Sequence, residues 1–333
     1  MKQNDKINGK KILVTGGAGF IGSNLIEALL SQNNQVTCLD NFSTGFRQNI
    51  EPFLNNADFR LIEGDIRERE TCATACDGVD YVLHQAALGS VPRSLKDPVT
   101  TIEVNIGGFT QMLWAAKNAG VKRFVYAASS STYGDSTELP KRENCIGKPL
   151  SPYAVSKYVD ELIAENFSSV YGIKTIGLRY FNVFGRRQSP AGAYAAVIPL
   201  FAAALLNHQS PKINGDGSYS RDFTYIDNVI QANQLAALTE NPKALNTVYN
   251  VAFGEQHSLN DLFELLRNHL SVFDSKIAEV QAEYVENRLG DIPHSLADIS
   301  KARKLLGYNP QFDFKSGLAE ASNWYVKTLC PTG

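Results

Sequence analysis

The chain has 333 residues, of which 44% are hydrophobic and 20% are charged, and its formal net charge is −2. That length is too great for one small hydrophobic core, and it predicts either two lobes or one large α/β unit. The near-neutral charge gives no electrostatic reason to expect a nucleic acid or a membrane surface as a partner.

The first residues, MKQNDKINGKK, are polar, so we expect no signal peptide, and no apolar run approaches the ~20 residues of a membrane span. Five cysteines are scattered without a C-x-x-C pair, which favours reduced thiols and a cytoplasmic protein. The five histidines show no metal-ligand spacing, so we expect no metal site.

The first half of the chain alternates short apolar runs with helical patterns, for example at residues 21–32 and 105–120. Strands that are apolar along their whole length are typical of a sheet covered by helices on both faces. Repeated βα units therefore predict an α/β fold with a doubly wound parallel sheet of the Rossmann type. The predicted strands are residues 10–16, 35–40, 59–65, 79–87, 123–129 and 174–181.

The pattern loosens after about residue 180, where loops rich in Gly, Ser and Pro alternate with amphipathic helices at residues 259–270 and 300–307. We predict two lobes, one of residues 1–180, joined by later segments around 220–250, and one of residues 181–333. No flexible linker separates them, so the second lobe should pack against the first.

The segment KKILVTGGAGFIGSNL carries the first chemical signal. A predicted strand ends before Gly16, further glycines follow at Gly19 and Gly22, and a helix begins. Glycines allow a tight turn and close approach of a pyrophosphate, and a helix N-terminus offers N–H groups and a partial positive charge. The spacing is G-x-x-G-x-x-G, and without the strand–turn–helix context it would indicate only an ordinary turn.

Asp40 ends the second predicted strand, where a carboxylate would accept hydrogen bonds from the adenosine ribose hydroxyls and repel a 2′-phosphate. This favours NAD as the cofactor, although Arg47 nearby keeps NADP open. Asp40 would also suit an ordinary turn in DNFSTG.

Later strand ends add candidates for the cofactor site, because ligands of open α/β sheets lie at the carboxyl ends of the strands. Asp65 suits a contact to adenine, and Gln85, Ala86 and Ala87 would let the backbone approach the cofactor, although small residues also suit simple packing. Neighbouring residues complete the predicted cofactor contacts: Phe20, Ile21, Asn41, Phe42, Ser43, Thr44, Gly45, Ile66, Asn105 and Tyr180.

The stretch LSPYAVSKY predicts a helix with Ser151 as N-cap and Pro152 in its first turn, which places Tyr153 and Lys157 on one face. A tyrosine with a pKa of about 10 needs a shift of roughly three units, about 4 kcal/mol, to act as a base near neutrality. A lysine charge about 5 Å away contributes about 3 kcal/mol at an effective dielectric constant of 20. By itself, the pair would equally suit a core tyrosine and a solvated lysine.

Ser129, Ser130 and Ser131 follow another predicted strand in AASSSTYGD. Their hydroxyls could hold a sugar oxygen for proton transfer to Tyr153, or they could simply form a polar loop.

These motifs together resemble the extended short-chain dehydrogenase/reductase superfamily. The segments SSSTYGD, SPYAVSKY, LRYFNVFGRRQ, INGDGSYSRDFTYIDN and RLGDIPHSLADISKA are similar to those of nucleotide-sugar 4-epimerases, from about residue 10 to 325. HQAALGSVPRS and HSLADIS look most like the branch that interconverts UDP-N-acetylglucosamine and UDP-N-acetylgalactosamine. The segment after Asn49 is shorter than in those relatives.

The resemblance implies a redox cycle without net oxidation. Tyr153, as phenolate, would take the proton from the sugar O4 while C4 gives hydride to a retained NAD, and the hydride would return to the other face of a 4-keto sugar. Lys157 would hold the cofactor ribose and keep the pKa of Tyr153 low, and Ser129 and Ser130 would position the reacting oxygen. Relatives pair two helices per subunit, which implies a homodimer.

The resemblance also implies a set of nucleotide-sugar contacts. Arg221 and Arg288 suit a diphosphate, because guanidinium groups match phosphate oxygens, although each arginine alone would suit a surface ion pair. Asp291 suits ribose hydroxyls. The implied substrate-binding residues are Gly89, Ser90, Ser130, Ser131, Asn182, Ala196, Val197, Lys212, Asn214, Arg221, Arg288, Asp291 and Ser295.

The resemblance implies that Ser295 stands where relatives that act on plain hexoses carry a bulky residue, and Gly89 and Ser90 are also small. Our hypothesis is that these three residues leave room for an acetamide group. The sequence therefore favours UDP-N-acetylhexosamines, with UDP-glucose and UDP-galactose as the alternative main substrates. A 4,6-dehydratase would need an Asp-Glu pair where Ser130 and Ser131 stand. A non-catalytic NAD sensor remains open, but such proteins commonly lack the Tyr or Lys.

Overall fold

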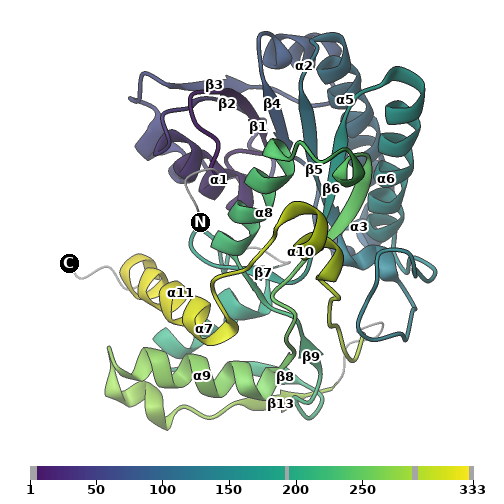
Figure 1. Cartoon of the computed structure of the whole chain (residues 1–333). Coiled ribbons are helices and arrows are strands. Elements are labelled where there is room, and N and C mark those ends of the chain that lie inside the picture. The colour runs from purple at the N-terminus through teal and green to yellow at the C-terminus, as the bar shows by residue number, and fades with distance from the viewer. Residues whose placement is uncertain (1–5, 192–194, 287–291, 330–333) are drawn as a thin grey trace.

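A seven-stranded parallel sheet forms the centre of the protein, in a computed structural model that describes residues 6–191, 195–286 and 292–329. Its strands are β1 (Lys11–Thr15), β2 (Gln35–Asp40), β3 (Phe59–Glu63), β4 (Tyr81–His84), β5 (Arg123–Ser129), β6 (Thr175–Tyr180) and β11 (Thr247–Val251). They lie in the order β3-β2-β1-β4-β5-β6-β11 (Figure 1). All six predicted strands are present, and β11 is a strand that the sequence reading missed.

Helices cover both faces of the sheet, as the doubly wound α/β prediction requires (Figure 1). α1 (Phe20–Leu30) and α8 (Ile226–Leu238) cover one face, whereas α2 (Arg69–Cys76), α5 (Phe109–Asn118) and α6 (Pro152–Tyr171) cover the other. Alternate residues of β1 enter different cores: Ile12 and Val14 pack with α1, and Leu13 packs with the α2–α5 side. The uniformly apolar strands of the sequence are thus explained by burial on both faces.

The strand order reverses between β1 and β4, because β1 continues to β2 and β3 on one side and β4 continues to β5 and β6 on the other. At such a switch point the loops after neighbouring strands diverge and leave a crevice at their carboxyl ends. Three further helical segments lie between β4 and α5 and pack against α6. They are α3 (Val91–Lys96), α4 (Pro98–Ile102) and the π-helical turn η4 (Glu103–Gly108).

A second group of elements lies below the carboxyl edge of the sheet in Figure 1. Its helices are α7 (Val197–Leu206), α9 (Leu259–Ser271) and α11 (Phe314–Leu329), whereas α10 (Ser300–Leu306) packs beside β11 and α8 of the sheet. Its paired strands are β7 (Val183–Phe184) with β10 (Thr224–Tyr225), β8 (Lys212–Asn214) with β13 (Glu283–Val285), and β9 (Ser220–Arg221) with β12 (His257–Ser258). Short 3₁₀ turns complete the chain: η2 (Arg47–Asn49), η3 (Glu51–Phe53), η5 (Ser130–Tyr133), η6 (Pro242–Ala244) and η7 (Ser275–Glu279).

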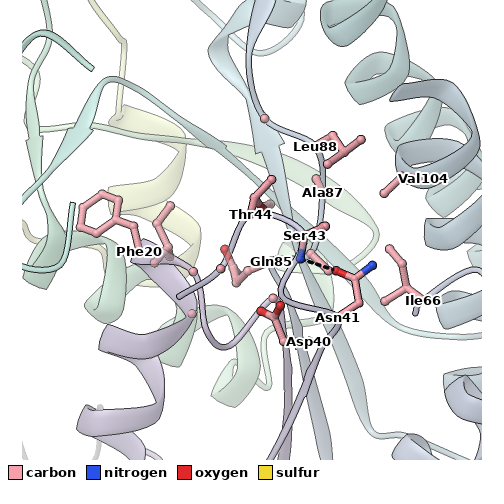
Figure 2. A pocket seen from close by; sticks show the side chains of 18 of the residues that line it. Phe20, Asp40, Asn41, Ser43, Thr44, Ile66, Gln85, Ala87, Leu88 and Val104 are labelled. Carbon is pink, nitrogen blue, oxygen red and sulfur yellow. Dashed lines mark hydrogen bonds between the residues drawn. The ribbon is translucent and has the colours of Figure 1, made fainter. Parts of the chain in front are cut away.

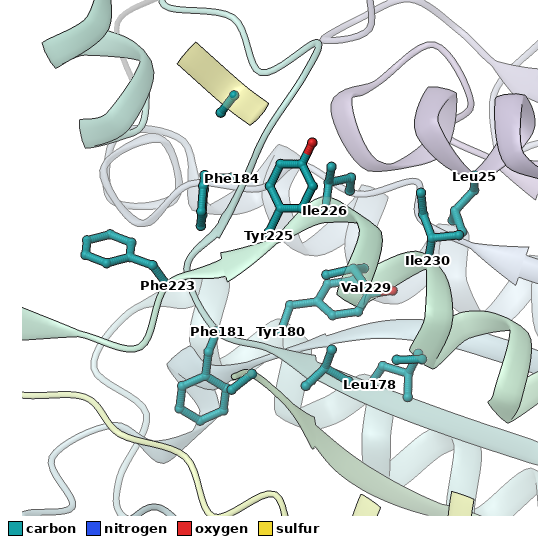
Figure 3. Packing of buried hydrophobic residues seen from close by; sticks show 14 of the residues in the cluster. Leu25, Leu178, Tyr180, Phe181, Phe184, Phe223, Tyr225, Ile226, Val229 and Ile230 are labelled. Carbon is teal, nitrogen blue, oxygen red and sulfur yellow. The ribbon is translucent and has the colours of Figure 1, made fainter. Parts of the chain in front are cut away.

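One hydrophobic cluster runs from the sheet into this second group (Figure 3). Phe184 contacts Phe223, Tyr225 and Phe314 through tilted or edge-on ring pairs with centroids 5.6–6.4 Å apart. Because these rings come from segments far apart in the sequence, they fix the elements below the sheet against its carboxyl edge. Within the described ranges, no helix combines the length and the apolar character needed to cross a bilayer.

Candidate active site

A cavity of about 850 Å³ opens at the carboxyl ends of the strands (Figure 2). This volume lies within the range of ligand pockets, roughly 300–1,000 Å³. Every predicted cofactor residue except Asn105 lines it, together with Ser129, Gly89 and Ala196. The cavity therefore joins the glycine turn to the predicted catalytic pair.

The glycine turn is sterically specified at two positions. Gly16 has a φ of +66°, and a Cβ there would lie 2.8 Å from the backbone nitrogen of Ala86. A Cβ on Gly22 would collide with the carbonyl oxygen of Gly16. Gly19 is the N-cap of α1, so the first-turn N–H groups of that helix face the cavity and can receive a pyrophosphate.

We expect Gly16→Ala to weaken NAD binding at least about tenfold, because the added methyl group must displace β4 from the turn. Gly9→Ala is a matched control, because Gly9 also has a positive φ, +62°, yet a Cβ there meets no atom within 4 Å. Calorimetric titration of both variants with NAD after cofactor removal measures the effect. Equal affinity in the two variants would show that contact with Ala86 is unimportant.

Asp40 is 8% exposed and holds the turn together from the end of β2. Its Oδ2 accepts a hydrogen bond from the Ala18 N–H at 2.9 Å, and its Oδ1 accepts one from the Phe42 N–H at 2.8 Å. Burial raises the pKa of Asp40 above its usual value. Each oxygen keeps a further lone pair, so the carboxylate can also accept from ribose hydroxyls at the cavity wall.

Asp65 belongs to a polar group at the adjacent end of the cavity. Its carboxylate accepts from Arg67 Nε at 3.0 Å and Nη2 at 2.7 Å, and from Asn41 Nδ2 at 2.9 Å. The hydrogen bonds from Arg67 lower the pKa of Asp65 to about 2. Asn41 in turn accepts from the Ser43 N–H at 3.0 Å (Figure 2). These hydrogen bonds hold the side chains of Asp65 and Asn41 in fixed positions at the cavity wall.

The predicted catalytic pair lies at the start of α6, which begins as expected: the Ser151 hydroxyl accepts from the Ala154 N–H at 3.1 Å and Pro152 is the first helical residue. Tyr153 is half-buried in the cavity wall, and Lys157 is only 3% exposed. The α-helix places both side chains on one face, directed at the same cavity.

Lys157 is held by two acceptors. Its Nζ lies 3.0 Å from the carbonyl oxygen of Ala127 on β5 and 3.3 Å from Oδ2 of Asp160, one turn further along α6. The sequence reading did not single out Asp160. Its only signal was the i,i+3 spacing from Lys157, which places two charges on one helix face.

Tyr180 also lines the cavity, but its environment differs from that of Tyr153. Its hydroxyl donates to Gln85 Oε1 at 3.1 Å and accepts from Asn233 Nδ2 at 2.9 Å. Burial raises the pKa of Tyr180 to about 12. Tyr180 therefore keeps its proton near neutrality.

The three predicted serines do not all face the cavity. Ser129 lines the cavity, whereas Ser130 and Ser131 do not. The Ser131 hydroxyl donates to Ser129 Oγ at 2.9 Å, and the Ser131 N–H donates to the same oxygen at 3.2 Å. These bonds leave the Ser129 proton available to an oxygen in the cavity.

Asn105 is 1% exposed and does not line the cavity. Its side chain joins the cavity loop to the catalytic helix: Oδ1 accepts from the Leu88 N–H at 2.8 Å, and Nδ2 donates to Ser156 Oγ at 2.9 Å. It lies in the π-helical turn η4, a distortion that often marks functional regions. Asn105 thus fixes two parts of the cavity wall relative to each other.

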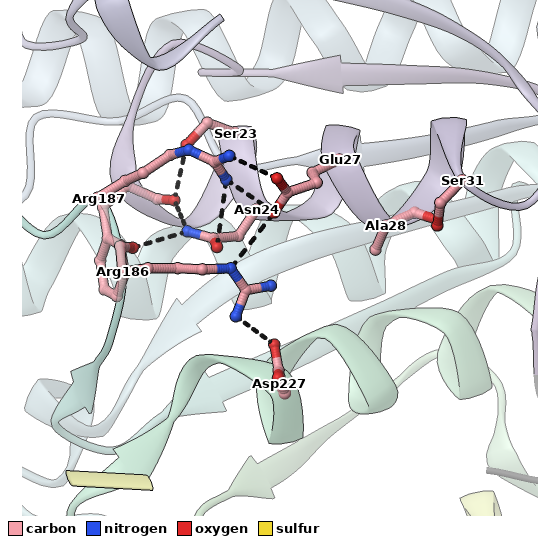
Figure 4. A network of polar contacts seen from close by, with 9 residues as sticks. Ser23, Asn24, Glu27, Ala28, Ser31, Arg186, Arg187 and Asp227 are labelled. Carbon is pink, nitrogen blue, oxygen red and sulfur yellow. Dashed lines mark hydrogen bonds and ion pairs between the residues drawn. The ribbon is translucent and has the colours of Figure 1, made fainter. Parts of the chain in front are cut away.

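Two arginines connect the loop after β7 to the cofactor side (Figure 4). Arg187 Nη2 lies 2.7 Å from Glu27 Oε1 on α1, and Arg186 Nη1 lies 2.7 Å from Asp227 Oδ1 on α8. Asn24 Nδ2 also donates to the Arg186 carbonyl at 3.0 Å. The loop that brings Gln188 into the cavity is therefore fixed to the helix below the glycine turn.

Several predicted substrate residues lie outside the cavity lining. Ser90 caps α3, Val197 begins α7, and the Arg221 guanidinium donates to the carbonyls of Ser220 and Pro293. Arg288 and Asp291 lie outside the described residues. The others that do not line the cavity are Asn182, which follows β6, Lys212 and Asn214 on β8, and Ser295 beside β9.

The cavity also contains residues that the sequence reading missed. Arg93 stands on the first turn of α3, and Gln188 and Ser189 follow the arginine pair of the β7 loop. The sequence signal that could have identified Arg93 as a site residue is its position shortly after Gly89 and Ser90. Within the described part of the chain, no group of three or more His, Cys, Asp or Glu side chains could hold a metal ion.

Comparisons with known proteins agree with this geometry. The UDP-N-acetylglucosamine 4-epimerase from Methanobrevibacter ruminantium, solved with UDP-N-acetylmuramic acid, is 38% identical with a TM-score of 0.88, covering 96% of this chain and 99% of that chain. The UDP-glucose 4-epimerase from Thermotoga maritima, solved with UDP-glucose, is 35% identical with a TM-score of 0.87 and the same coverage.

A curated UDP-glucose 4-epimerase from Mycolicibacterium smegmatis is 32% identical over 317 residues, which are 95% of this chain and 98% of that relative. The model of the NAD dependent epimerase/dehydratase family matches residues 12–252, from β1 to the residue after β11. The family match identifies NAD as the cofactor, in agreement with the expectation from the glycine turn and Asp40. The chain belongs to the NAD dependent epimerase/dehydratase family.

Proposed function

We propose that the protein catalyses reversible C4 epimerisation of a UDP-N-acetylhexosamine, converting UDP-N-acetylglucosamine to UDP-N-acetylgalactosamine. The observation that carries the proposal is the shared cavity, in which Tyr153 and Lys157 lie beside a glycine turn suited to NAD. When bound in this site, NAD would supply the hydride transfer to and from C4. The same cavity then needs only one proton acceptor at O4.

Each residue has a distinct proposed task. Tyr153 takes the O4 proton as hydride leaves and gives it back on return. Lys157 favours the Tyr153 phenolate through its positive charge. Ser129, whose oxygen already accepts from Ser131, donates its own proton to the substrate oxygen and fixes its position.

A dehydratase is less well supported. Elimination of the C6 oxygen requires an acid close to the sugar, yet Ser130 and Ser131 stand where that acid would be. Ser131 is also engaged with Ser129. The C6 oxygen is therefore retained, and the 4-keto sugar would be reduced again at C4 on its opposite face.

For the nucleotide, we propose that Ala196 and Val197 at the start of α7 and Lys212, Asn214 and Arg221 on the neighbouring strands contact the UDP group. Asn182 would approach from the end of β6, and Arg288 and Asp291 would add a diphosphate contact and a ribose contact. Ala196 lines the cavity and caps α7, so that helix N-terminus also favours a negative charge.

The preference for an acetamido sugar rests on three small residues. A Cβ on Gly89 would meet no atom within 4 Å, so space is open beside it. Ser90 follows, and the Ser295 N–H donates to the Ser220 carbonyl at 3.1 Å, next to Arg221. The two solved relatives named above carry different sugar specificities in their names, so UDP-glucose and UDP-galactose remain the alternative.

We expect Ser295→Tyr to lower kcat/KM for UDP-N-acetylglucosamine about tenfold or more while largely sparing UDP-glucose, because the ring would fill the acetamide space. Ser275→Tyr, at an exposed serine of η7, is the matched control. Unchanged turnover of the acetylated sugar in Ser295→Tyr would remove Ser295 from the proposed pocket.

The direct test is incubation of the protein with UDP-N-acetylglucosamine, UDP-N-acetylgalactosamine, UDP-glucose and UDP-galactose separately, followed by resolution of the C4 epimers. The proposal expects the acetylated pair to interconvert fastest, without accumulation of NADH. Faster interconversion of UDP-glucose and UDP-galactose would establish these two sugars as the main substrates. Bound NAD with no turnover of any sugar would instead favour a sensor.

We also propose a homodimer. Leu95 of α3, Val99 of α4 and Leu162 of α6 are 64%, 65% and 47% exposed, on helices that pack against one another. Pairing of these helices with a second copy would remove that apolar surface from water. Sedimentation equilibrium decides between a monomer and a dimer.

A further inference from the structure

We propose that Asp160 is a positioning residue that controls the charge Lys157 presents to Tyr153, so that ionisation of Asp160 and of Tyr153 is coupled. The inference rests on the proposed epimerase function and adds a residue that neither the motif nor the cavity lining includes. Asp160 acts through Lys157 and touches no substrate.

The ion pair between Lys157 and Asp160 is buried away from solvent. The side chains of Lys157 and Asp160 are 4% and 1% exposed, with Nζ 3.3 Å from Oδ2. The second oxygen, Oδ1, is buried without a hydrogen-bond partner. A buried carboxylate with one unsatisfied oxygen is a costly anion, and its attraction to Lys157 must offset that cost.

Burial accordingly raises the pKa of Asp160 to about 7, against the opposing effect of Lys157. Asp160 therefore changes charge within the pH range in which the enzyme must work. When it is protonated, the full positive charge of Lys157 acts on Tyr153. When it is ionised, it cancels part of that charge and makes the Tyr153 phenolate less favourable.

Three other ionisable groups lie around the pair, and each is held by burial or by a partner. Glu161, the next residue on α6, is bound in a bidentate ion pair by Arg179 of β6. Burial lowers the pKa of His84 on β4 to about 3, so its ring is neutral beside Lys157. Tyr126 of β5 is buried near both carboxylates, and its pKa is raised well above the usual value. The variable charge is thus that of Asp160.

The test compares the pH dependence of kcat/KM in the NAD-loaded wild type, Asp160→Asn and Glu165→Gln. Asparagine keeps the shape of aspartate without its charge. Glu165 is an exposed carboxylate on the same helix, so its variant removes the same charge without contact to Lys157. We expect the acid limb of the kcat/KM profile of Asp160→Asn to lie about half to one pH unit lower than that of wild type. It should also follow a single ionisation. The limb of Glu165→Gln should overlay that of wild type.

A merely structural Asp160 would change kcat, KM or thermal stability in Asp160→Asn without moving the acid limb, and that result would overturn the inference. Tyrosinate absorbance provides a second readout that needs no turnover, with Tyr153→Phe as the blank. It should report a lower Tyr153 pKa in Asp160→Asn and in Asp160→Ser than in wild type. If wild type turns over none of the four sugars, the proposed function fails, and an unshifted absorbance titration separately disproves the coupling.

Discussion

Tyr153→Phe should reduce epimerisation about 10³-fold while leaving the fold and the bound NAD in place. The substitution removes one oxygen from a half-buried ring and leaves the packing of α6 unchanged. General base catalysis typically contributes 10²–10⁴-fold. Tyr180, the other phenol among the described residues that line the cavity, is hydrogen-bonded to Gln85 and Asn233 and keeps its proton.

The measurement is the initial rate of C4 epimer formation at saturating substrate, with the NAD content of each protein determined after denaturation. Tyr158→Phe serves as the control, because Tyr158 is on the same helix but outside the cavity lining. Both variants should contain NAD, and only Tyr153→Phe should be slow. A near-normal rate in Tyr153→Phe would disprove the proposed mechanism.

The sequence predicted those parts of the site that depend on neighbours along the chain. The glycine turn needs only a strand, three glycines and a helix start, and the cap of α6 needs only Ser151 and Pro152. Asp40 could be identified because it ends the strand that follows the glycine turn and its helix. The fold class followed for the same reason, since each βα unit carries its own apolar pattern.

The parts that the sequence did not predict depend on long-range contacts. Strand β11 is five residues long and is a strand because β6 offers it an open edge. Asn105 was expected at the cofactor, yet its amide is used to join Leu88 to Ser156. Arg93 reaches the cavity only because α3 starts next to the loop after β4. None of these contacts leaves a periodic signal in the sequence.

A long-range contact also holds α6 against the sheet, and no sequence motif indicates it. α6 carries Tyr153 and Lys157 at one end, and its position relative to the sheet decides where their side chains lie. Glu161 binds Arg179 of β6 through two bonds, Nε to Oε1 at 2.8 Å and Nη2 to Oε2 at 2.7 Å. Both side chains are almost fully buried, at 7% and 3% exposure.

Glu161→Gln should therefore destabilise the protein by about 3–5 kcal/mol, because the buried Arg179 charge loses its negative partner and keeps only neutral neighbours such as the new amide, the Glu143 carbonyl and the Tyr133 ring. Chemical and thermal unfolding measure the loss, with Glu165→Gln on the exposed face of α6 as the control. The NAD-loaded proteins should be compared, since ligand binding shifts apparent stability.

The double variant Glu161→Leu with Arg179→Met distinguishes the cost of an unpaired charge from the loss of an attractive pair. It removes both charges and fills the space with apolar side chains, so we expect it to be markedly more stable than Glu161→Gln. If the double variant is as unstable as the single one, the attraction itself holds α6 in place. If it is stable but slow, the ion pair aligns Tyr153 and Lys157 with the cavity, and its main contribution is to catalysis.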